Sequence, residues 1–298
     1  MRSLFGIIPP ATTPFTADGE IDVAAARRQV RWLIGQGAHG LAVGGSTGEG
    51  HTLETDEFRR LVGESVQESA GAVPVVAGII VDSTRDAIRR GLAVCDLGVA
   101  ALQVTPVHYL FRPDDASMLA HFRALTEATG LPVLIYNVVP WSYLSPALLI
   151  RIMREVPGVI GVKQSAGDLK LVADLMRMAG PTDLIFTAVD ALLYPSFALR
   201  AHGAIAAILT AAPRACVDLW EAVEAGDHAR ALNLHGKLLD LWNALIADNL
   251  PACTKYAQSL QGCAAGLPRA PMPAASPAQQ AAIAAALGGL GVELTRAA

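Results

Sequence analysis

The first 212 residues alternate between strand-like apolar runs and amphipathic helices, and this alternation limits the possible folds more than any other feature. Eight strand–helix units follow one another at a spacing of roughly 25 to 30 residues, without the Asn-Gly turns that mark β-hairpins. Strands separated by helices pair in parallel. Eight such units favour closure into a (β/α)8 barrel, a fold that typically uses about 250 residues as one domain.

The predicted strands are rich in β-branched residues and bounded by Gly or Pro, as expected for strands buried on both faces. They cover 7–11, 40–43, 73–81, 100–105, 132–137, 183–188 and 204–208, and the sixth lies within 157–165 and ends at Lys163. Helices are expected to begin at capping residues such as Asp22, Ser83 and Ser145. Beyond the barrel, helices are expected over 214–225, 227–248 and 250–262, with a last one after Ser276.

We therefore expect an α/β protein with a catalytic (β/α)8 barrel over 1–212 and a C-terminal helical extension, 213–298, packed on the barrel. An open, doubly wound sheet is the alternative. It is less consistent with the sequence, because no Gly-x-Gly-x-x-Gly turn follows the first strand and eight regular units favour closure.

Charge and composition exclude several classes of partner. The net charge is −4 and no basic block is present, which argues against nucleic acid and anionic membranes. The longest apolar runs, such as 203–212, are shorter than the roughly 18 residues of a membrane span. Residues 1–15 lack a signal-peptide pattern, and the four cysteines show no ligand or disulfide spacing. These features predict a cytoplasmic protein with free thiols.

Candidate catalytic residues lie where the barrel strands end, because active sites in this fold form at the carboxyl ends of the strands. Lys163 ends the sixth strand and is one of only four lysines in the chain. The second strand ends in a turn that contains Gly45, Ser46 and Thr47. Tyr136 ends the fifth strand, and the loop after the fourth carries Tyr109. Each residue alone has an ordinary structural explanation, but together at one mouth they indicate a site.

This set of residue types suits imine chemistry. Burial at an apolar rim disfavours a lysine's ammonium form and favours the nucleophilic amine, which attacks a ketone to give a Schiff base. A tyrosine hydroxyl held by a second hydroxyl can carry the protons that this reaction moves. Successive backbone N–H groups in the turn at Gly45–Thr47 can bind a carboxylate. A keto acid therefore fits the predicted site.

Three motifs resemble the signatures of the dihydrodipicolinate synthase / N-acetylneuraminate lyase family: Gly45-Ser46-Thr47-Gly48-Glu49, Tyr136-Asn137-Val138 and Gly161-Val162-Lys163. Thr13-Pro14-Phe15 with Asp18-Gly19 fits the same family. The resemblance spans the whole chain. It implies a pyruvate-dependent class I aldolase or lyase that needs no metal or other cofactor and assembles as a homotetramer.

The resemblance also implies roles for single residues. Lys163 would form the imine with pyruvate, Tyr136 would transfer protons, and Ser46 would relay them. Thr47 and the turn at Gly45 would hold the pyruvate carboxylate, and the backbone carbonyl of Ala206 would contact pyruvate. Tyr109 resembles the tyrosine that reaches into a neighbouring subunit's site, although His108 could take that place.

Departures from the family pattern bear on the aldehyde partner. Synthases of the family carry an arginine shortly after the Tyr-Asn motif, which grips the second substrate's carboxylate; here residues 139–143 hold no cation. Ser46 resembles the lyase branch, and Gln164 stands where glutamate is common. We therefore expect a less anionic acceptor aldehyde, with Trp141 and Tyr143 as candidate walls of its pocket unless both rings pack under the loop.

Alternatives to this function differ in the groups that they need. A true 4-hydroxy-tetrahydrodipicolinate synthase, which condenses pyruvate with aspartate semialdehyde, is the alternative within the family. A metal-dependent aldolase would need clustered ligands, and His51 and His108 alone provide none. A phosphate-binding barrel would need a Gly-rich turn after strand seven or eight, and residues 188–190 and 209–211 contain no glycine. An unphosphorylated substrate is therefore favoured. A non-catalytic keto-acid-binding barrel could dispense with Ser46 and Tyr136, and the presence of both favours catalysis.

Overall fold

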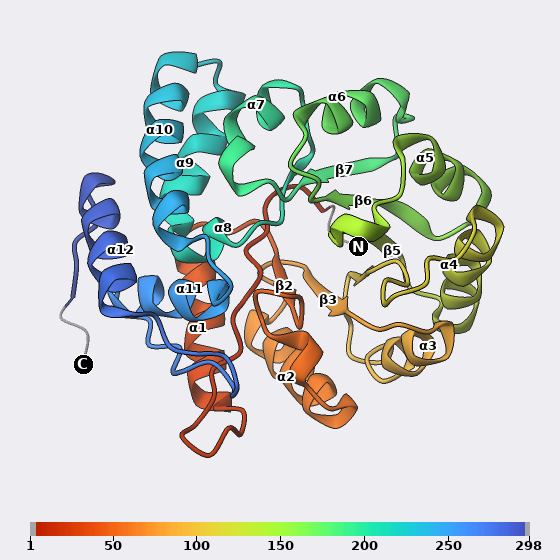
Figure 1. Cartoon of the computed structure of the whole chain (residues 1–298), viewed down its shortest axis with the longest axis horizontal. Helices are drawn as coiled ribbons and strands as arrows, with labels where there is room; N and C mark the ends of the chain where they lie inside the picture. Colours follow the sequence, from red (N-terminus) through yellow and green to blue (C-terminus); the bar gives the residue numbers. More distant parts are fainter. Residues whose placement is uncertain (1–3, 296–298) are drawn as a thin grey trace.

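The apolar runs form eight short strands, all parallel, in one curled sheet (Figure 1). The computed structural model describes residues 4–295. The strands are β1 (Gly6–Ile7), β2 (Leu41–Val43), β3 (Val75–Ile79), β4 (Ala101–Val104), β5 (Val133–Asn137), β6 (Val159–Gln164), β7 (Leu184–Thr187) and β8 (Gly203–Ala204).

Hydrogen bonds between the two ends of the sheet close it into a barrel. The strand order is β1-β8-β7-β6-β5-β4-β3-β2, so β1 and β2 are the edges. Directly after β1, Pro10 forms a parallel bridge with Ala42 of β2. The Ala11 N–H donates to the Ala42 carbonyl at 2.8 Å, and the Ala42 N–H donates to the Pro9 carbonyl at 3.0 Å. The predicted (β/α)8 barrel is confirmed.

Helices follow the strands and surround the barrel (Figure 1). They are α1 (Val23–Gly35), α2 (Thr55–Ser69), α3 (Thr84–Leu92), α4 (Asp115–Thr129), α5 (Pro146–Glu155), α6 (Leu169–Met178), α7 (Leu193–Ala198) and α8 (Ile208–Ala211), with 3₁₀ turns η1 (Gly50–Thr52), η2 (Pro140–Ser142) and η3 (Asp190–Leu192). The predicted caps are observed: the side chains of Asp22, Ser83 and Ser145 accept hydrogen bonds from the first turns of α1, α3 and α5.

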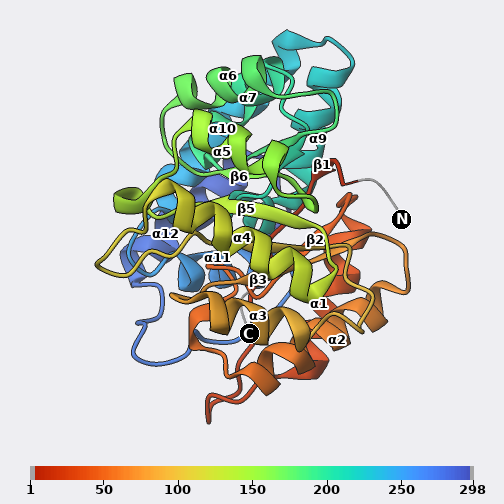
Figure 2. The same cartoon turned by 90° about the vertical axis from the view of Figure 1, so that its right-hand side faces the viewer.

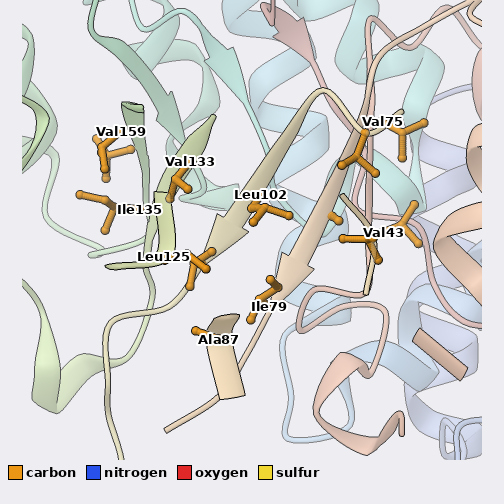
Figure 3. Close-up of a cluster of buried hydrophobic side chains, with 14 of the residues drawn as sticks. Val43, Val75, Ile79, Ala87, Leu102, Leu125, Val133, Ile135 and Val159 are labelled. Carbon is orange, nitrogen blue, oxygen red and sulfur yellow. The ribbon is translucent and has the colours of Figure 1, made fainter. Parts of the chain in front are cut away.

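Alternate residues of each strand face different parts of the core. On β4, Ala101 packs inside the barrel with Leu134 and Phe186, whereas its neighbour Leu102 packs outward. Figure 3 shows part of the outer layer, where strand residues such as Leu102 meet Leu125 of α4. In the side view of Figure 2, α3 and α4 lie across the neighbouring strands. Both strand faces are buried, which explains the continuous apolar runs in the sequence.

Four further helices follow the barrel and gather on one side of it (Figure 1); they are α9 (Pro213–Glu224), α10 (His228–Leu245), α11 (Leu250–Ser259) and α12 (Pro277–Gly289). Leu219, Leu241 and Ile283 of this group share a core with Ile7 of β1 and Ala204 of β8. The C-terminal helices therefore pack on the barrel. The domain boundary at 212 stays a prediction, and residues 1–3 and 296–298 of the two predicted domains lie outside the described residues.

The sequence overestimated the first and eighth strands. Residues 7–11 were expected to be a strand, but Pro9 and Pro10 lack N–H groups, and β1 ends at Ile7. The expected strand 204–208 ends at Ala204, and Ile208 begins helix α8 instead. No helix within residues 4–295 is both long and apolar enough to cross a membrane.

Buried His121 makes stability dependent on pH. Its ring is 3 % exposed, Nδ1 lies 2.9 Å from the Thr84 hydroxyl, and Nε2 has no partner within residues 4–295. Burial lowers the His121 pKa from 6.5 to about 4. The unfolded chain therefore binds a proton at His121 near pH 6.5, whereas the folded chain binds it only near pH 4. The free energy of unfolding consequently falls as the pH drops from about 6.5 to about 4.

We expect His121 to contribute a loss of about 3 kcal/mol in unfolding free energy between pH 7 and pH 4. Urea unfolding across this range measures it. His121→Leu is expected to flatten the pH dependence below pH 6.5, and parallel curves for the variant and the wild type would contradict the assignment.

Candidate active site

Lys163 lies on the inner face of β6, near the carboxyl end of the strand. It pairs in register with Tyr136 of β5, so both side chains point into the barrel mouth. The lysine side chain is almost completely buried, at 4 % exposure. Its Nζ lies 3.7 Å from the centroid of the Tyr136 ring. The amine is therefore withdrawn from bulk water and held against an aromatic face.

Tyr136 is connected to the turn after β2. Its hydroxyl donates to Ser46 Oγ at 3.1 Å, across 90 residues of sequence. The two hydroxyls form a short chain beside the Lys163 amine. Such a pair can pass a proton between a bound reactant and the protein.

Glycines allow the turn after β2 to fold tightly against the barrel. The Glu49 N–H donates to the Ser46 carbonyl, and the Gly50 N–H donates to the Gly45 carbonyl, each at 3.0 Å. A Cβ at Gly50 would lie 1.8 Å from the Gly44 carbonyl oxygen, so only glycine fits there. The backbone N–H groups of Ser46 and Thr47 have no acceptor within residues 4–295. They are free to bind an anion.

These groups surround a cavity of about 260 Å³. It is lined by Ser46, Thr47, Tyr136, Val138, Lys163, Ser165, Ala188, Asp190, Ile205, Ala206, Ala207, Leu250 and Pro251. Of the residues selected from the sequence, the structure brings Ser46, Thr47, Tyr136, Lys163 and Ala206 to this cavity. Four segments that are distant in sequence, namely the turn after β2, β5, β6 and the segment after β8, thus meet at one mouth.

Three selected residues lie elsewhere. Gly45 is not among the lining residues. It packs beside Gln103, and a Cβ added to Gly45 would lie 3.4 Å from the Gln103 amide nitrogen. Tyr109 and Trp141 are 66 % and 69 % exposed and lie outside this cavity. The Trp141 Nε1–H donates to the carbonyls of His108 and Tyr109, at 2.6 and 3.0 Å. Trp141 therefore ties the loop after β4 to η2.

The orientation of His108 bears on the proton relay. Its Nδ1 lies 3.0 Å from the Pro106 carbonyl and 3.3 Å from Asp82 Oδ1. Neither His108 nor Tyr109 lines this cavity. The Tyr143 hydroxyl, the other candidate wall, contacts the Ser165 carbonyl at 3.4 Å.

Sequence reasoning missed Asp190, Ser165, Leu250 and Pro251 as cavity residues. Asp190 follows β7, so its position near a strand end was an available signal. Leu250 and Pro251 gave no such signal, because they come from α11 of the C-terminal group. The Ile208 N–H donates to Asp190 Oδ1 at 2.8 Å. Burial raises the Asp190 pKa to about 6, although nearby Lys163 and backbone N–H groups oppose the shift.

A larger cavity, of about 560 Å³, lies behind the turn, between η1 and the segment before α12. It contains Glu49, His51 and Arg269 but no lysine or tyrosine. No three His, Cys, Asp or Glu side chains in the described part of the chain come together as a metal site. The combination of amine, phenol and free backbone N–H groups belongs to the smaller cavity.

The sequence matches the model of the dihydrodipicolinate synthetase family over residues 3–289. The chain belongs to this family. It is 38 % identical to a 4-hydroxy-tetrahydrodipicolinate synthase of Methylobacterium radiotolerans over 87 % of this chain and 86 % of the relative. It is 36 % identical to a protein of the same name from Ruegeria pomeroyi over 95 % of this chain and 97 % of that relative.

Solved structures of the dihydrodipicolinate synthetase family share the fold. YagE of E. coli K12, described in complex with pyruvate, has a TM-score of 0.92 at 25 % identity, over 98 % of this chain and 100 % of that one. The synthase DapA-2 of Bacillus anthracis has a TM-score of 0.91 at 26 % identity, over 97 % and 99 %. The predicted family is confirmed, and with it the class of enzyme, a lyase or synthase.

Gly78 of β3 supports the turn from inside the barrel. A Cβ at Gly78 would lie 2.7 Å from the Gly45 nitrogen and 2.8 Å from its Cα. We expect Gly78→Ala to lower the unfolding free energy by about 1–3 kcal/mol, because backbone must move to admit the methyl group. Gly63→Ala on α2 is the matched control: its nearest neighbour lies at 3.7 Å, and helix propensity predicts a gain of up to about 1 kcal/mol. Urea unfolding compares the two variants, and equal effects would show that Gly78 is not needed for the packing of the turn.

Proposed function

We propose that this protein is a pyruvate-dependent class I aldolase in which Lys163 forms the imine. The observation that carries the proposal is the position of the buried Lys163 amine, in one cavity with the Tyr136–Ser46 hydrogen bond and the free N–H groups of the turn. An amine, a proton relay and an anion site are the groups that Schiff-base formation with a keto acid needs. The pyruvate complex described for YagE supports the choice of keto acid.

In the proposed reaction, the neutral Lys163 amine attacks the keto carbon of pyruvate and gives a carbinolamine. Tyr136, in contact with Ser46, returns a proton to the hydroxyl group that leaves as water, which produces the imine. Tyr136 then accepts a proton from the methyl carbon, which gives an enamine. The enamine attacks the aldehyde, and Tyr136 donates its proton to the new alkoxide. Water then adds to the imine carbon and gives a proton to Tyr136, and collapse of the carbinolamine releases the product and the free amine. The reverse sequence cleaves a hydroxylated 2-keto acid.

The keto acid would be held by its carboxylate. The Ser46 and Thr47 N–H groups and the Thr47 hydroxyl lie at one side of the cavity, and Ala206 lies on its wall with a carbonyl that can contact the bound pyruvate. This placement orients the keto carbon toward Lys163. The reaction uses no metal or other cofactor in this scheme, because the lysine itself supplies the electron sink.

The charges of the cavity favour an uncharged aldehyde. Lys163, which the imine consumes, is the one cation among its lining residues, and Asp190 adds a carboxylate. No arginine is present there to pair with a second carboxylate. The curated relatives named 4-hydroxy-tetrahydrodipicolinate synthase keep that condensation, with aspartate semialdehyde, as the second candidate. A non-catalytic keto-acid-binding barrel is less consistent with the intact Tyr136–Ser46 pair.

We further propose a homotetramer in the cytoplasm. The loop after β4 exposes Tyr109, Leu110 and Phe111 beside Trp141, at 66 to 83 % exposure. A second copy of the chain that covers this surface would bring Tyr109 near a neighbouring cavity. A solution mass of four chains supports this arrangement, and a monomer opposes it. One structural neighbour is described as a monomeric synthase variant.

Reductive trapping tests the chemistry. Pyruvate with borohydride is expected to add one reduced pyruvyl group per chain, detected by intact mass and mapped to Lys163. Lys163→Arg should abolish the adduct because its guanidinium is not nucleophilic at neutral pH. Tyr136→Phe should keep binding but slow trapping about 100-fold or more, the range of general acid–base catalysis. An unmodified Lys163 peptide would refute the proposal.

A panel of aldehydes with pyruvate tests the acceptor. We expect uncharged aldehydes to be condensed with a kcat/KM at least about tenfold above that for aspartate semialdehyde, since an unpaired buried carboxylate is costly. The measurement is product formation by mass spectrometry at equal concentrations. Preference for aspartate semialdehyde would favour the synthase alternative instead.

A further inference from the structure

A buried ion pair links the turn after β2 to helix α11. The Lys255 ammonium of α11 donates to Glu49 Oε1 at 2.6 Å, and the two side chains are 1 % and 0 % exposed. The two residues are 206 positions apart. Glu49 is the last residue of the motif Gly45–Glu49, three positions after Ser46. The pair therefore connects the proposed anion site to the C-terminal helices.

The backbone at Glu49 needs this support. Its φ of 53° and ψ of 31° lie in the left-handed region, which is strained for a residue other than glycine. The Glu49 N–H closes the turn on the Ser46 carbonyl. Since the same residue carries the buried carboxylate, the contacts that hold this carboxylate also restrain the backbone of the turn. The Ser46 and Thr47 N–H groups lie within three residues of it.

The second carboxylate oxygen extends the connection. Glu49 Oε2 accepts a hydrogen bond from the backbone N–H of Arg269 at 2.8 Å. The Arg269 guanidinium donates in turn to the Gly19 and Thr52 carbonyls and pairs with Glu57 of α2. Lys255 also donates to the Leu267 carbonyl at 2.9 Å. The turn is thus held by α11 and by the segment that follows it.

Helix α11 reaches the catalytic cavity as well. Leu250 and Pro251 in its first turn line the cavity, whereas Lys255 is not among the lining residues. One short helix therefore supplies part of the cavity wall and, about one turn later, the group that anchors the anion site. Movement of α11 would displace both together.

Stability alone is a weak reason for this ion pair. Desolvation of two buried charges often costs as much as their attraction returns, so an apolar pair of similar volume can be as stable. Burial lowers the Lys255 pKa, and Glu49 opposes that shift. What the pair adds over apolar packing is direction: hydrogen bonds of 2.6 and 2.8 Å fix the carboxylate and the backbone that carries it.

We propose that Glu49 and Lys255 are positioning residues for keto-acid binding, which hold the Ser46 and Thr47 N–H groups where they meet the substrate carboxylate. The proposal rests on the proposed function. It assigns part of the pyruvate site to the C-terminal helical region, although no atom of Lys255 lines the cavity.

The experiment compares Glu49→Gln, Lys255→Met and the double variant in the full-length protein. Each single change leaves one buried charge without its partner and is expected to lower stability in urea unfolding. The double change removes both charges and should recover most of that loss. The pyruvate concentration for half-maximal borohydride trapping is nevertheless expected to rise about tenfold or more in all three variants, with a smaller change in trapping at saturation. Displacing binding groups mainly weakens binding.

Lys170→Met is the matched control, because Lys170 forms an ion pair of the same 2.6 Å length with Asp174 on the surface of α6. It should leave both the unfolding free energy and the pyruvate concentration for half-maximal trapping near the wild-type values.

A double variant that recovers the wild-type half-saturation together with stability would overturn the proposal. If the Lys255 variants do not fold, Glu49→Gln decides, since it keeps an acceptor for the Arg269 N–H; unchanged half-saturation would then overturn it. Failure of the wild type to trap pyruvate would instead refute the proposed function.

Discussion

Closure of the parallel ring is the constraint on which the rest of this structure depends. The bonds between residues 9–11 and Ala42 join the two edge strands, so all eight strands end around one mouth. Without that ring, Ser46 and Lys163 would have no reason to meet, because they are 117 positions apart in the sequence. The inner-facing register of Tyr136 and Lys163 then places a phenol and an amine side by side. Barrel closure and strand register therefore bring the residues of the site together.

Within that frame, small residues and buried charges shape the chemistry. Gly50 and Gly78 let the turn after β2 pack against backbone at distances that any side chain would prevent. The result is a tightly packed turn in which the N–H groups of Ser46 and Thr47, which have no acceptor within residues 4–295, lie beside a buried amine. On the outer side, the carboxylate of Glu49 ties the same loop to Lys255 and Arg269. The cavity is therefore built by barrel and C-terminal helices together.

Much of this could be predicted from the sequence, and the exceptions have physical causes. Regular strand–helix alternation and capping residues such as Ser145 indicated the barrel, its helices and the positions of Lys163, Tyr136 and Ser46. The end of the eighth strand could not be predicted, because Ile208 is apolar whether it lies in a strand or a helix. Pro9 and Pro10, by contrast, were an available signal that the first strand ends early. Trp141 was expected near the acceptor, yet its indole N–H binds the loop after β4. Contacts such as Lys255 with Glu49 depend on tertiary packing that no local pattern encodes.

A crystal structure of the protein soaked with pyruvate tests the central claim most directly. We expect continuous density from Lys163 Nζ to the former keto carbon, with the carboxylate on the Ser46 and Thr47 N–H groups and the Tyr136 hydroxyl within hydrogen-bond distance of the reacting atoms. Pyruvate bound elsewhere, or bound in this cavity with its carboxylate away from the turn and no bond to Lys163, would contradict that claim.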